Sequence, residues 1–504
     1  MRISYIYKME NFKISNAAEA FLKKEQHDFF INNKWVRTDS PKTIDIVNPA
    51  NDSIVGKISV ATAEDVKNAI TSGKRAFQNK VWRDMSPIKR EQLLHNLADL
   101  MQDHLIPMAE ILTIENGKLL SHAKSEIQGA INTFRYYAGW ATKIEGQTID
   151  LSLRQKPGFK NFAFIKKEPI GLVAVIVPWN FPISIATWKL APLLAAGCTA
   201  VLKPSEVTPL STLYLAQLFE LAGFPPGVVN VITGDGESGA ALTSNPQVDK
   251  ITFTGSTQVG KIIGQAAMQN LTPISLELGG KSPAIVFDDA DLTAAAKGVA
   301  LGIFRNGGQV CVAGSRVYIQ KKVYDNVLAD IISEGKKMNM SDGFDEKADL
   351  GPLVSKKHLE SVSAYIAKGQ EGGAQLVSGG SSPNRQGCFL EPTVFSTTDN
   401  NHLIVQEEVF GPVLVAIPFD NKEDALRMAN DSRYGLASSV WTKDISKALQ
   451  CVDALDAGWV FVNSPSRSDP NLPLGGNKNS GIGRELGKEG LYTYLKTKGV
   501  NIVY

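Results

Sequence analysis

Short apolar runs alternate with helical patterns along the first half of the chain. The runs that we expect to form buried strands, rich in Val and Ile, cover residues 171–178, 199–202, 228–232, 250–253 and 284–287. Apolar residues recur at helical spacing in 63–79, 88–116, 186–195, 209–222, 237–244 and 257–268. Alternating buried strands and helices predict an α/β fold with a parallel sheet that helices cover on both faces.

A second alternating series follows Glu277. The expected helices are 291–305, 322–338, 356–372, 422–430 and 444–455, and the expected strands are 315–319, 413–417, 438–441 and 458–463. This series predicts a second α/β domain.

Two segments, 143–168 and 494–504, fit neither series, because apolar and polar residues alternate in them without helix signals. Both are predicted to be exposed strands. An exposed strand edge promotes aggregation unless another strand pairs with it, so we expect a homo-oligomer that pairs these edges. The alternative is a local hairpin arm in a monomer.

Composition narrows the class of protein. A chain of 504 residues is longer than a single hydrophobic core usually supports, so two or three domains are expected. The net charge of +2 does not indicate a basic surface that would bind nucleic acid. No apolar stretch is long enough to form a membrane helix. The four cysteines form no CxxC pair and none neighbours a histidine, which argues against a disulfide scaffold and a metal site. Without a signal peptide pattern, we expect a cytoplasmic protein with reduced thiols.

One cysteine is a candidate nucleophile. Cys311 lies between Val310 and Val312 in RNGGQVCVAGSR, after two glycines. The pattern suits a tight turn that leads into a helix, where backbone N–H groups would lower the pKa of the thiol and stabilise an oxyanion. The alternative is a small buried hydrophobic residue.

Two polar residues stand at predicted strand ends. Glu277, in SLELGGKSP, is either a salt-bridged structural acid or a base with a shifted pKa. Asn180, in IVPWNFP, is either a turn residue or an amide donor to a developing oxyanion.

Glycine-rich turns offer two places for dinucleotide phosphates. GDGESG (234–239) matches GxGxxG but lacks an acid about 20 residues further on. GSTQVG (255–260) also follows a strand and opens a helix. The segment KPSE ends another strand with Lys203 and Glu206, whose carboxylate would accept ribose hydroxyls and repel a 2′-phosphate. NAD is therefore favoured over NADP.

Taken together, the motifs resemble those of the aldehyde dehydrogenase superfamily. IVPWNFP, KPSE, FTGST, LELGGKSP, GQVC, EEVFGP and LPLGGNKNSGIGRELG occur in that family's order and spacing. The resemblance runs from about residue 30 to the end. It implies a Rossmann-like coenzyme-binding domain (25–142 and 169–278), a catalytic domain (279–480) and an oligomerisation arm (143–168 and 481–504), with a tetramer favoured over a dimer.

The resemblance also implies roles. Cys311 matches the nucleophile, Glu277 the general base, and Asn180 with the Cys311 N–H the oxyanion hole, while Lys189 and Glu485 match positions that relay protons. GDGESG then becomes a plain strand–helix turn. The positions that match coenzyme-binding residues are Ile176, Pro178, Trp179, Lys203, Ser205, Glu206, Gly255, Ser256, Leu278, Glu408 and Phe410.

The implied reaction is oxidation of an aldehyde to its acid. The thiolate attacks the aldehyde carbon, a hydride passes to the nicotinamide, and water activated by Glu277 hydrolyses the thioester. CoA-acylating relatives generally lack an acid at this position, so no CoA requirement is expected. A thioesterase and a non-enzymatic structural protein are the alternatives from other classes.

The matched substrate tunnel is apolar, which favours a hydrophobic aldehyde. Several stretches also resemble bacterial phenylacetaldehyde dehydrogenases. Arg467, in a nearby loop, would instead suit succinic semialdehyde. Betaine aldehyde is a third alternative, although a cation prefers aromatic faces and the tunnel offers few. The expected tunnel residues are Phe181, Ile185, Trp188, Val310, Val312 and Leu474.

Overall fold

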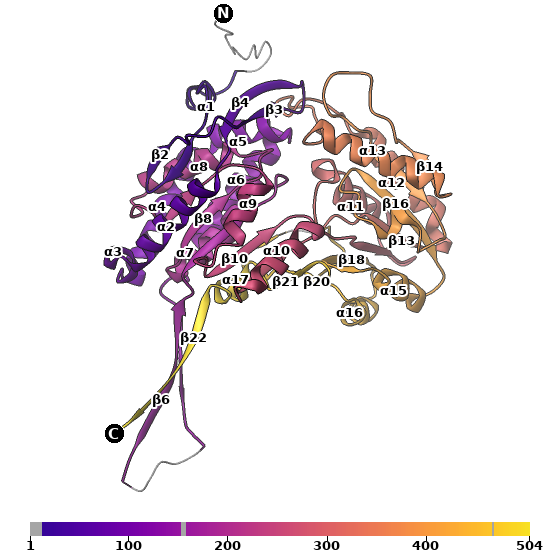
Figure 1. The fold of residues 1–504 in the computed structure, drawn as a ribbon. Coiled ribbons are helices and arrows are strands. Elements are labelled where there is room, and N and C mark those ends of the chain that lie inside the picture. The colour runs from indigo at the N-terminus through magenta and orange to yellow at the C-terminus, as the bar shows by residue number, and fades with distance from the viewer. Residues whose placement is uncertain (1–12, 153–157, 466–467) are drawn as a thin grey trace, which may run out of the picture.

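The chain folds into two α/β bodies and a projecting arm of strands (Figure 1). The computed structural model describes residues 13–152, 158–465 and 468–504. Each body has its own sheet and its own hydrophobic core. The predicted α/β class is confirmed.

The first body is built on an eight-stranded sheet with the order β2-β1-β9-β8-β7-β10-β11-β21. Strands β7 to β11 are parallel, and the chain order reverses direction between β7 and β10. The carboxyl ends of the strands at such a switch point form a crevice suited to a ligand. The strands are β1 (Phe29–Ile31), β2 (Lys34–Val36), β7 (Leu172–Ile176), β8 (Thr199–Lys203), β9 (Val229–Val231), β10 (Lys250–Thr254), β11 (Ile274–Glu277) and β21 (Gly481–Ile482).

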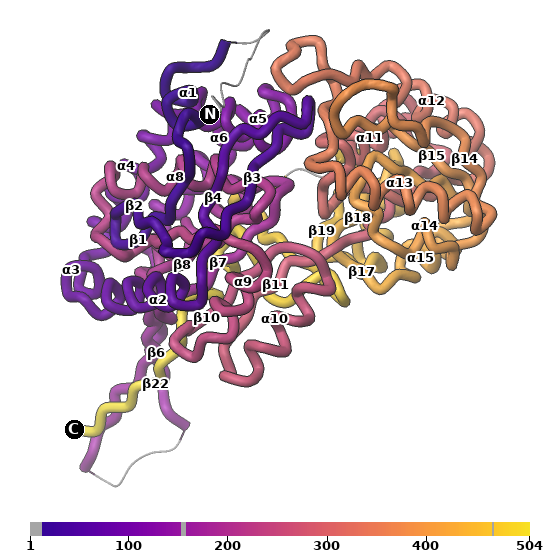
Figure 2. Tube along the Cα trace, turned by 45° about the horizontal axis from the view of Figure 1, so that its top comes forward, coloured from indigo at the N-terminus to yellow at the C-terminus, as the bar shows by residue number. Residues whose placement is uncertain are grey.

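Helices cover both faces of this sheet (Figure 2). The predicted helix 88–116 is two helices that meet at His104, and the segment 117–142, for which we predicted no element, holds a further long helix, α6. The helices are α1 (Asn16–Leu22), α2 (Ala63–Gln78), α3 (Lys80–Arg83), α4 (Pro87–Asp103), α5 (Leu105–Asn116), α6 (Leu120–Ala138), α7 (Pro182–Ala196), α8 (Leu210–Leu221), α9 (Gly236–Thr243) and α10 (Thr257–Gln269).

The second body contains a seven-stranded sheet with the order β14-β15-β16-β13-β12-β18-β19. Side chains alternate across it: Ile285 packs toward α13 and α15, whereas Val286 packs toward α11 and α12. The elements are β12 (Pro283–Val286), α11 (Leu292–Phe304), β13 (Arg316–Gln320), α12 (Tyr324–Lys337), α13 (Lys356–Glu371), β14 (Gln375–Ser378), β15 (Thr393–Ser396), α14 (Leu403–Gln406), β16 (Val413–Phe419), α15 (Lys422–Asn430), β18 (Ala437–Trp441), α16 (Ile445–Ala454) and β19 (Trp459–Val462).

The arm is a three-stranded antiparallel sheet of β5 (Gln147–Ile149), β6 (Asn161–Pro169) and β22 (Leu495–Val503). The two predicted exposed segments thus pair with each other within one chain, and β22 runs beside β6 along its whole length. The outer edges of β5 and β22 have no strand partner among the described residues. A homo-oligomer that uses them, a tetramer in particular, stays a prediction.

Shorter elements connect these parts. Within 481–504, β21 extends the first sheet and α17 (Gly487–Tyr492) contacts α7, so β22 alone belongs to the arm. No helix of the described residues combines the length and apolarity needed to cross a bilayer. The other elements are β3 (Thr43–Asn48), β4 (Ser53–Ser59), β17 (Tyr434–Gly435), β20 (Asn477–Lys478) and the 3₁₀ turns η1 (Arg305–Gly308) and η2 (Lys321–Val323).

Candidate active site

Cys311 follows a sharp turn between α11 and β13. Asn306, Gly307 and Gly308 all have left-handed backbone conformations, with φ of 53°, 64° and 70°. A Cβ at Gly308 would overlap the carbonyl oxygen of Gly411, so a glycine is required there. The loop runs into a strand, and the prediction that it leads into a helix is wrong. The left-handed turn ends α11, and the apolar run after the loop joins the second sheet as β13.

Cys311 as a residue is partly exposed, whereas the other three cysteines are buried, but the fold encloses its thiol. Burial, together with the nearby charges of Glu408 and Glu277, raises the pKa of the Cys311 thiol to about 12. The backbone N–H groups of Val312 and Cys311 lower this pKa as predicted, but burial outweighs them. The predicted net lowering is therefore wrong for this state of the protein.

Glu277 ends β11 as a buried acid. Its side chain is 4% exposed, and neither carboxylate oxygen has a hydrogen-bond partner among the described residues. Burial raises the pKa of Glu277 well above its usual value, Glu485 raises it further, and the charges of Lys189 and Arg484 oppose the shift. A carboxyl group in this environment suits a general base near neutral pH.

Lys189 and Glu485 form a buried ion pair beside Glu277. Lys189 comes from α7 and also donates a 3.2 Å hydrogen bond to the hydroxyl of Thr252. The second carboxylate oxygen of Glu485 has no partner within the described part of the chain. The structure thus brings together the predicted base and both predicted relay residues.

Asn180 lies between β7 and α7 and reaches the cysteine loop. Its Nδ2 donates a 3.0 Å hydrogen bond to the carbonyl oxygen of Gln309, two residues before Cys311. The second hydrogen of this amide has no hydrogen-bond partner among the described residues. We did not predict Gln309, whose Oε1 accepts a 2.9 Å hydrogen bond from the Val354 N–H and so anchors the loop. A polar side chain between a glycine pair and the apolar VCV run was the available signal.

The predicted coenzyme residues of the first body gather at the ends of adjacent strands. Ile176, Pro178 and Trp179 end or follow β7, Lys203 to Glu206 end β8, and Gly255 and Ser256 follow β10. Lys203 Nζ lies 3.9 Å from a carboxylate oxygen of Glu206. The Ser205 hydroxyl accepts a 3.3 Å hydrogen bond from the Val207 N–H. Leu278 follows β11 and packs against Gly260 of α10.

The other glycine-rich turn is already filled. The carboxylate of Asp235 accepts hydrogen bonds from Glu237 N–H at 3.0 Å and Ser238 N–H at 3.4 Å at the start of α9. It also pairs with Lys42 at 2.7 Å. GDGESG therefore serves as a capped strand–helix turn, as the resemblance implied.

Glu408 and Phe410 belong to the second body and face the first. Glu408 accepts a 2.9 Å hydrogen bond from the Gly280 N–H, and burial raises its pKa to about 7. The Phe410 ring meets the Trp179 ring edge-on, with centroids 5.3 Å apart. We did not predict His358, whose Nε2 lies 2.8 Å from the Phe410 carbonyl oxygen.

An apolar cluster lies beside the cysteine loop. Trp188, Val312 and Leu474, all predicted tunnel residues, pack there together with Trp459 and Phe461, which we did not predict. The expectation of few aromatic faces is therefore wrong: the Trp459 and Phe461 rings meet edge-on at 5.4 Å. Residues of β19 alternate between faces, and the sequence alone does not say which face meets the loop.

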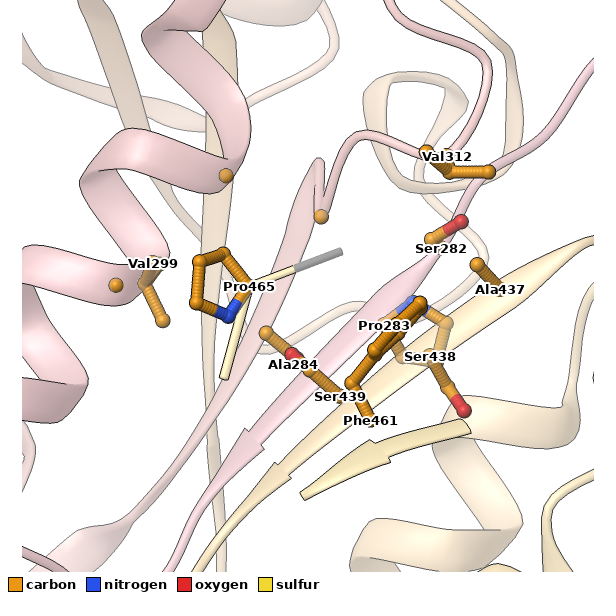
Figure 3. Close-up of a pocket in the computed structure, with 13 residues that line it drawn as sticks. Ser282, Pro283, Ala284, Val299, Val312, Ala437, Ser438, Ser439, Phe461 and Pro465 are labelled. Atoms are coloured by element: carbon orange, nitrogen blue, oxygen red, sulfur yellow. The ribbon is translucent and has the colours of Figure 1, made fainter. Parts of the chain in front are cut away.

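The remaining tunnel candidates lie in the adjoining cores. Phe181 and Ile185 pack with the core of the first body, and Val310 packs with the α11 face of the second. Arg467 lies outside the described residues. Behind Val312, a cavity separates α11 from strands β12 and β18, with Val312 and Ser282 on one side and Val299 and Pro465 on the other (Figure 3).

Comparison with known proteins identifies the family to which the chain belongs. The model of the aldehyde dehydrogenase family matches residues 35–500. The chain belongs to the aldehyde dehydrogenase family. A phenylacetaldehyde dehydrogenase from Pseudomonas fluorescens is 45% identical over 95% of this chain and 96% of the relative.

Solved structures of aldehyde dehydrogenases have the same fold. An aldehyde dehydrogenase from Bacillus cereus, solved as an NAD⁺ complex, has a TM-score of 0.95 and is 41% identical, covering 98% of this chain and 99% of that one. A betaine aldehyde dehydrogenase from Staphylococcus aureus in complex with NAD⁺ has a TM-score of 0.93 and is 39% identical, covering 96% of each chain. These similarities confirm the resemblance found in the motifs.

Proposed function

We propose that this aldehyde dehydrogenase uses NAD to oxidise a hydrophobic aldehyde to its carboxylic acid, with Cys311 as nucleophile and Glu277 as base. The observation that carries the proposal is the environment of Glu277: a buried carboxyl group without a hydrogen-bond partner among the described residues, close enough to Cys311 to shift the pKa of its thiol. A structural acid would have a partner. A base that activates water needs a free oxygen.

Different residues of the chain would carry out the successive steps of this reaction. The Cys311 thiol loses its proton to solvent, the thiolate attacks the aldehyde carbon, and the free amide hydrogen of Asn180 and the Cys311 N–H hold the resulting oxyanion. When bound, NAD supplies the hydride acceptor. Glu277 then takes a proton from the water that hydrolyses the Cys311 thioester, and the ion pair of Lys189 and Glu485 receives that proton. This route requires no CoA.

The crevice fits a dinucleotide. The Thr254 hydroxyl, at the end of β10, is buried and has no partner among the described residues, so it is free for a ligand group. Lys203 and Glu206 would hold the adenosine ribose, Gly255 and Ser256 the pyrophosphate, and Glu408 and Phe410 the nicotinamide end. Ile176, Pro178, Trp179, Ser205 and Leu278 would line the remaining contact surface.

Glu206 sets the coenzyme preference under this proposal. Its carboxylate, 45% exposed, would bind the ribose hydroxyls and repel a 2′-phosphate. We expect wild-type kcat/KM to favour NAD over NADP by at least about tenfold, and Glu206→Gln to reduce that ratio about tenfold. Steady-state kinetics with both coenzymes measure the ratio. Glu237→Gln, an exposed acid at the capped turn, is the control, and an unchanged ratio in Glu206→Gln would refute the role of Glu206.

The apolar cluster indicates the substrate class. Trp188, Val312, Leu474 and Phe461 form an apolar cluster beside Cys311, and Val312 and Phe461 also line the cavity of Figure 3. We expect kcat/KM for phenylacetaldehyde to exceed that for succinic semialdehyde or betaine aldehyde by at least about tenfold in an NADH assay. If kcat/KM were highest for succinic semialdehyde and this preference were lost in Arg467→Ala, succinic semialdehyde would replace phenylacetaldehyde as the proposed substrate. The absence of turnover with either coenzyme would favour a thioesterase or a structural role.

Betaine aldehyde is the second candidate. The rings of Trp459 and Phe461 add to those of Trp188 and Phe181, and aromatic faces attract a quaternary ammonium group. The same aldehyde panel separates the candidates. Phe461→Leu should lower kcat/KM for a cationic aldehyde several-fold more than for an aromatic one if betaine aldehyde is the substrate.

A further inference from the structure

The backbone that carries the Asn180 side chain is fixed by side chains from the α5–α6 turn. The Trp179 carbonyl oxygen accepts a 2.8 Å hydrogen bond from Asn116 Nδ2. The Asn180 carbonyl oxygen accepts a 2.8 Å hydrogen bond from Lys118 Nζ. Both donors belong to buried residues, 1% and 3% exposed. Two successive peptide groups before α7 are therefore held in place from another part of the chain.

Lys118 is also paired with a buried carboxylate. Its Nζ binds Glu126 of α6, and the two side chains are 1% and 2% exposed. The other carboxylate oxygen of Glu126 accepts hydrogen bonds from the N–H groups of Ile183 and Ser184, both at 3.1 Å. These are orphan donors of the first turn of α7, whose own N-cap residue provides no side-chain cap. Glu126 thus caps α7 from a distance, and Lys118 joins that cap to Asn180.

The position of the ammonium group is well defined. Lys118 Nζ lies 4.3 Å from the centroid of the Phe181 ring, the residue after Asn180. The turn that carries Lys118 is anchored on the second body, because the Leu120 N–H donates a 2.8 Å hydrogen bond to the Gly343 carbonyl oxygen. Gly117 has a φ of 84°, and a Cβ there would overlap Pro49 and Pro352. Little space is left for the turn to move.

Helix capping alone does not explain the lysine. Glu115 of α5 caps α8 by the same device, accepting hydrogen bonds from the N–H groups of Leu210 at 2.6 Å and Ser211 at 3.0 Å. The carboxylate is sufficient for that task. A buried ion pair gains little stability over apolar residues of similar size, because removing both charges from water is costly. What Lys118 adds is the contact with the Asn180 carbonyl oxygen.

We propose that Lys118 is a positioning residue for the reaction, which fixes the Asn180 peptide so that its amide points at the oxygen of the Cys311 adduct. This inference rests on the proposed role of Asn180 as an oxyanion donor. Donors of this kind act only when they are fixed in place before the charge develops. Loss of the contact should therefore slow the chemical step and leave substrate and coenzyme binding intact.

The test uses a double variant because Lys118→Met alone would leave Glu126 as an unpaired buried charge. In Lys118→Met/Glu126→Gln, the side-chain oxygen at position 126 still caps α7, and no charge is left unpaired. We expect a melting temperature close to that of the wild-type protein, a rate of the first NADH turnover about 30-fold lower, and KM for aldehyde and Kd for NAD within about twofold of wild type.

Two further variants separate the possible outcomes. Glu115→Gln, the matched cap on α8, should lower the melting temperature without slowing the first turnover. Asn180→Ala should slow the first turnover at least as much as the double variant. If Asn180→Ala is slow but the double variant turns over at the wild-type rate, the role of Lys118 is refuted and that of Asn180 survives. If Asn180→Ala is unaffected, both proposals fail.

Discussion

Replacing Cys311 by alanine should abolish aldehyde oxidation, with kcat lower by at least about 10⁴-fold. An aldehyde becomes a good hydride donor only after a nucleophile has added to its carbon, and Cys311 is the only one of the four cysteines that is not buried. NADH absorbance measures the loss. NAD binding, followed by quenching of tryptophan fluorescence, should persist, because the thiol contributes little to the coenzyme site.

Cys451 provides the matched control. It is fully buried in the second body, and Cys451→Ala should keep kcat within about twofold of wild type. If Cys311→Ala retained more than about one hundredth of the wild-type rate, a different nucleophile would have to be sought.

Replacing Glu277 by glutamine should separate the two halves of the reaction. Glutamine has the shape of the acid but cannot take a proton from water, so we expect steady-state turnover to fall about 10²- to 10³-fold while a first burst of NADH, one per active site, persists. Rapid-mixing kinetics measure the burst, and mass spectrometry of the quenched protein should find the acyl group on Cys311. Loss of the burst together with turnover would contradict a role restricted to hydrolysis. Glu237→Gln, at the protein surface, is the control.

The pH dependence has a definite sign. Because burial raises the pKa of Glu277, its carboxyl group is protonated and inactive at low pH and becomes a base as the pH rises. Steady-state turnover of the wild type should therefore increase with pH through the raised pKa. The raised pKa of the Cys311 thiol makes the first burst increase with pH as well. In Glu277→Gln, the rate of the first burst should still increase with pH. The remaining slow hydrolysis should lose the part of its pH dependence that comes from ionisation of the Glu277 carboxyl group.

The regular part of the fold was predictable from hydrophobic pattern. Strands β7, β8 and β10 begin and end within two residues of the predicted limits, because strands buried on both faces are continuous apolar runs. The helix α5 is buried on all sides and its apolar residues do not gather on one face, so its separation from α4 at His104 was missed. The segment that forms α6 also carries an apolar stripe at helical spacing, interrupted by buried polar residues such as Glu126, and we overlooked it.

The identity of the site residues was accessible from motifs, but their environment was not. The sequence places Asn180 and Cys311 far apart, and only the fold shows that the loop of Gln309 joins them. The direction of the Cys311 pKa shift depends on how deeply the fold buries the thiol and on the nearby Glu408 and Glu277, and no local sequence pattern records that. Lys118 and Glu126 stand in a stretch rich in polar residues, 115–128, so nothing in the sequence indicated that this pair is buried.

The left-handed turn before Cys311 also limits which positions of the enzyme can be substituted. A Cβ at Gly308 would overlap the backbone of Gly411, so a substitution at 308 displaces the cysteine loop, and a Cβ at Gly411 would overlap the Val362 side chain beneath that contact. A mutant library aimed at new aldehydes should keep 306–308 and 411 constant. Diversity is better placed at Trp459 and Phe461, which contribute to the apolar cluster from a strand at the edge of its sheet.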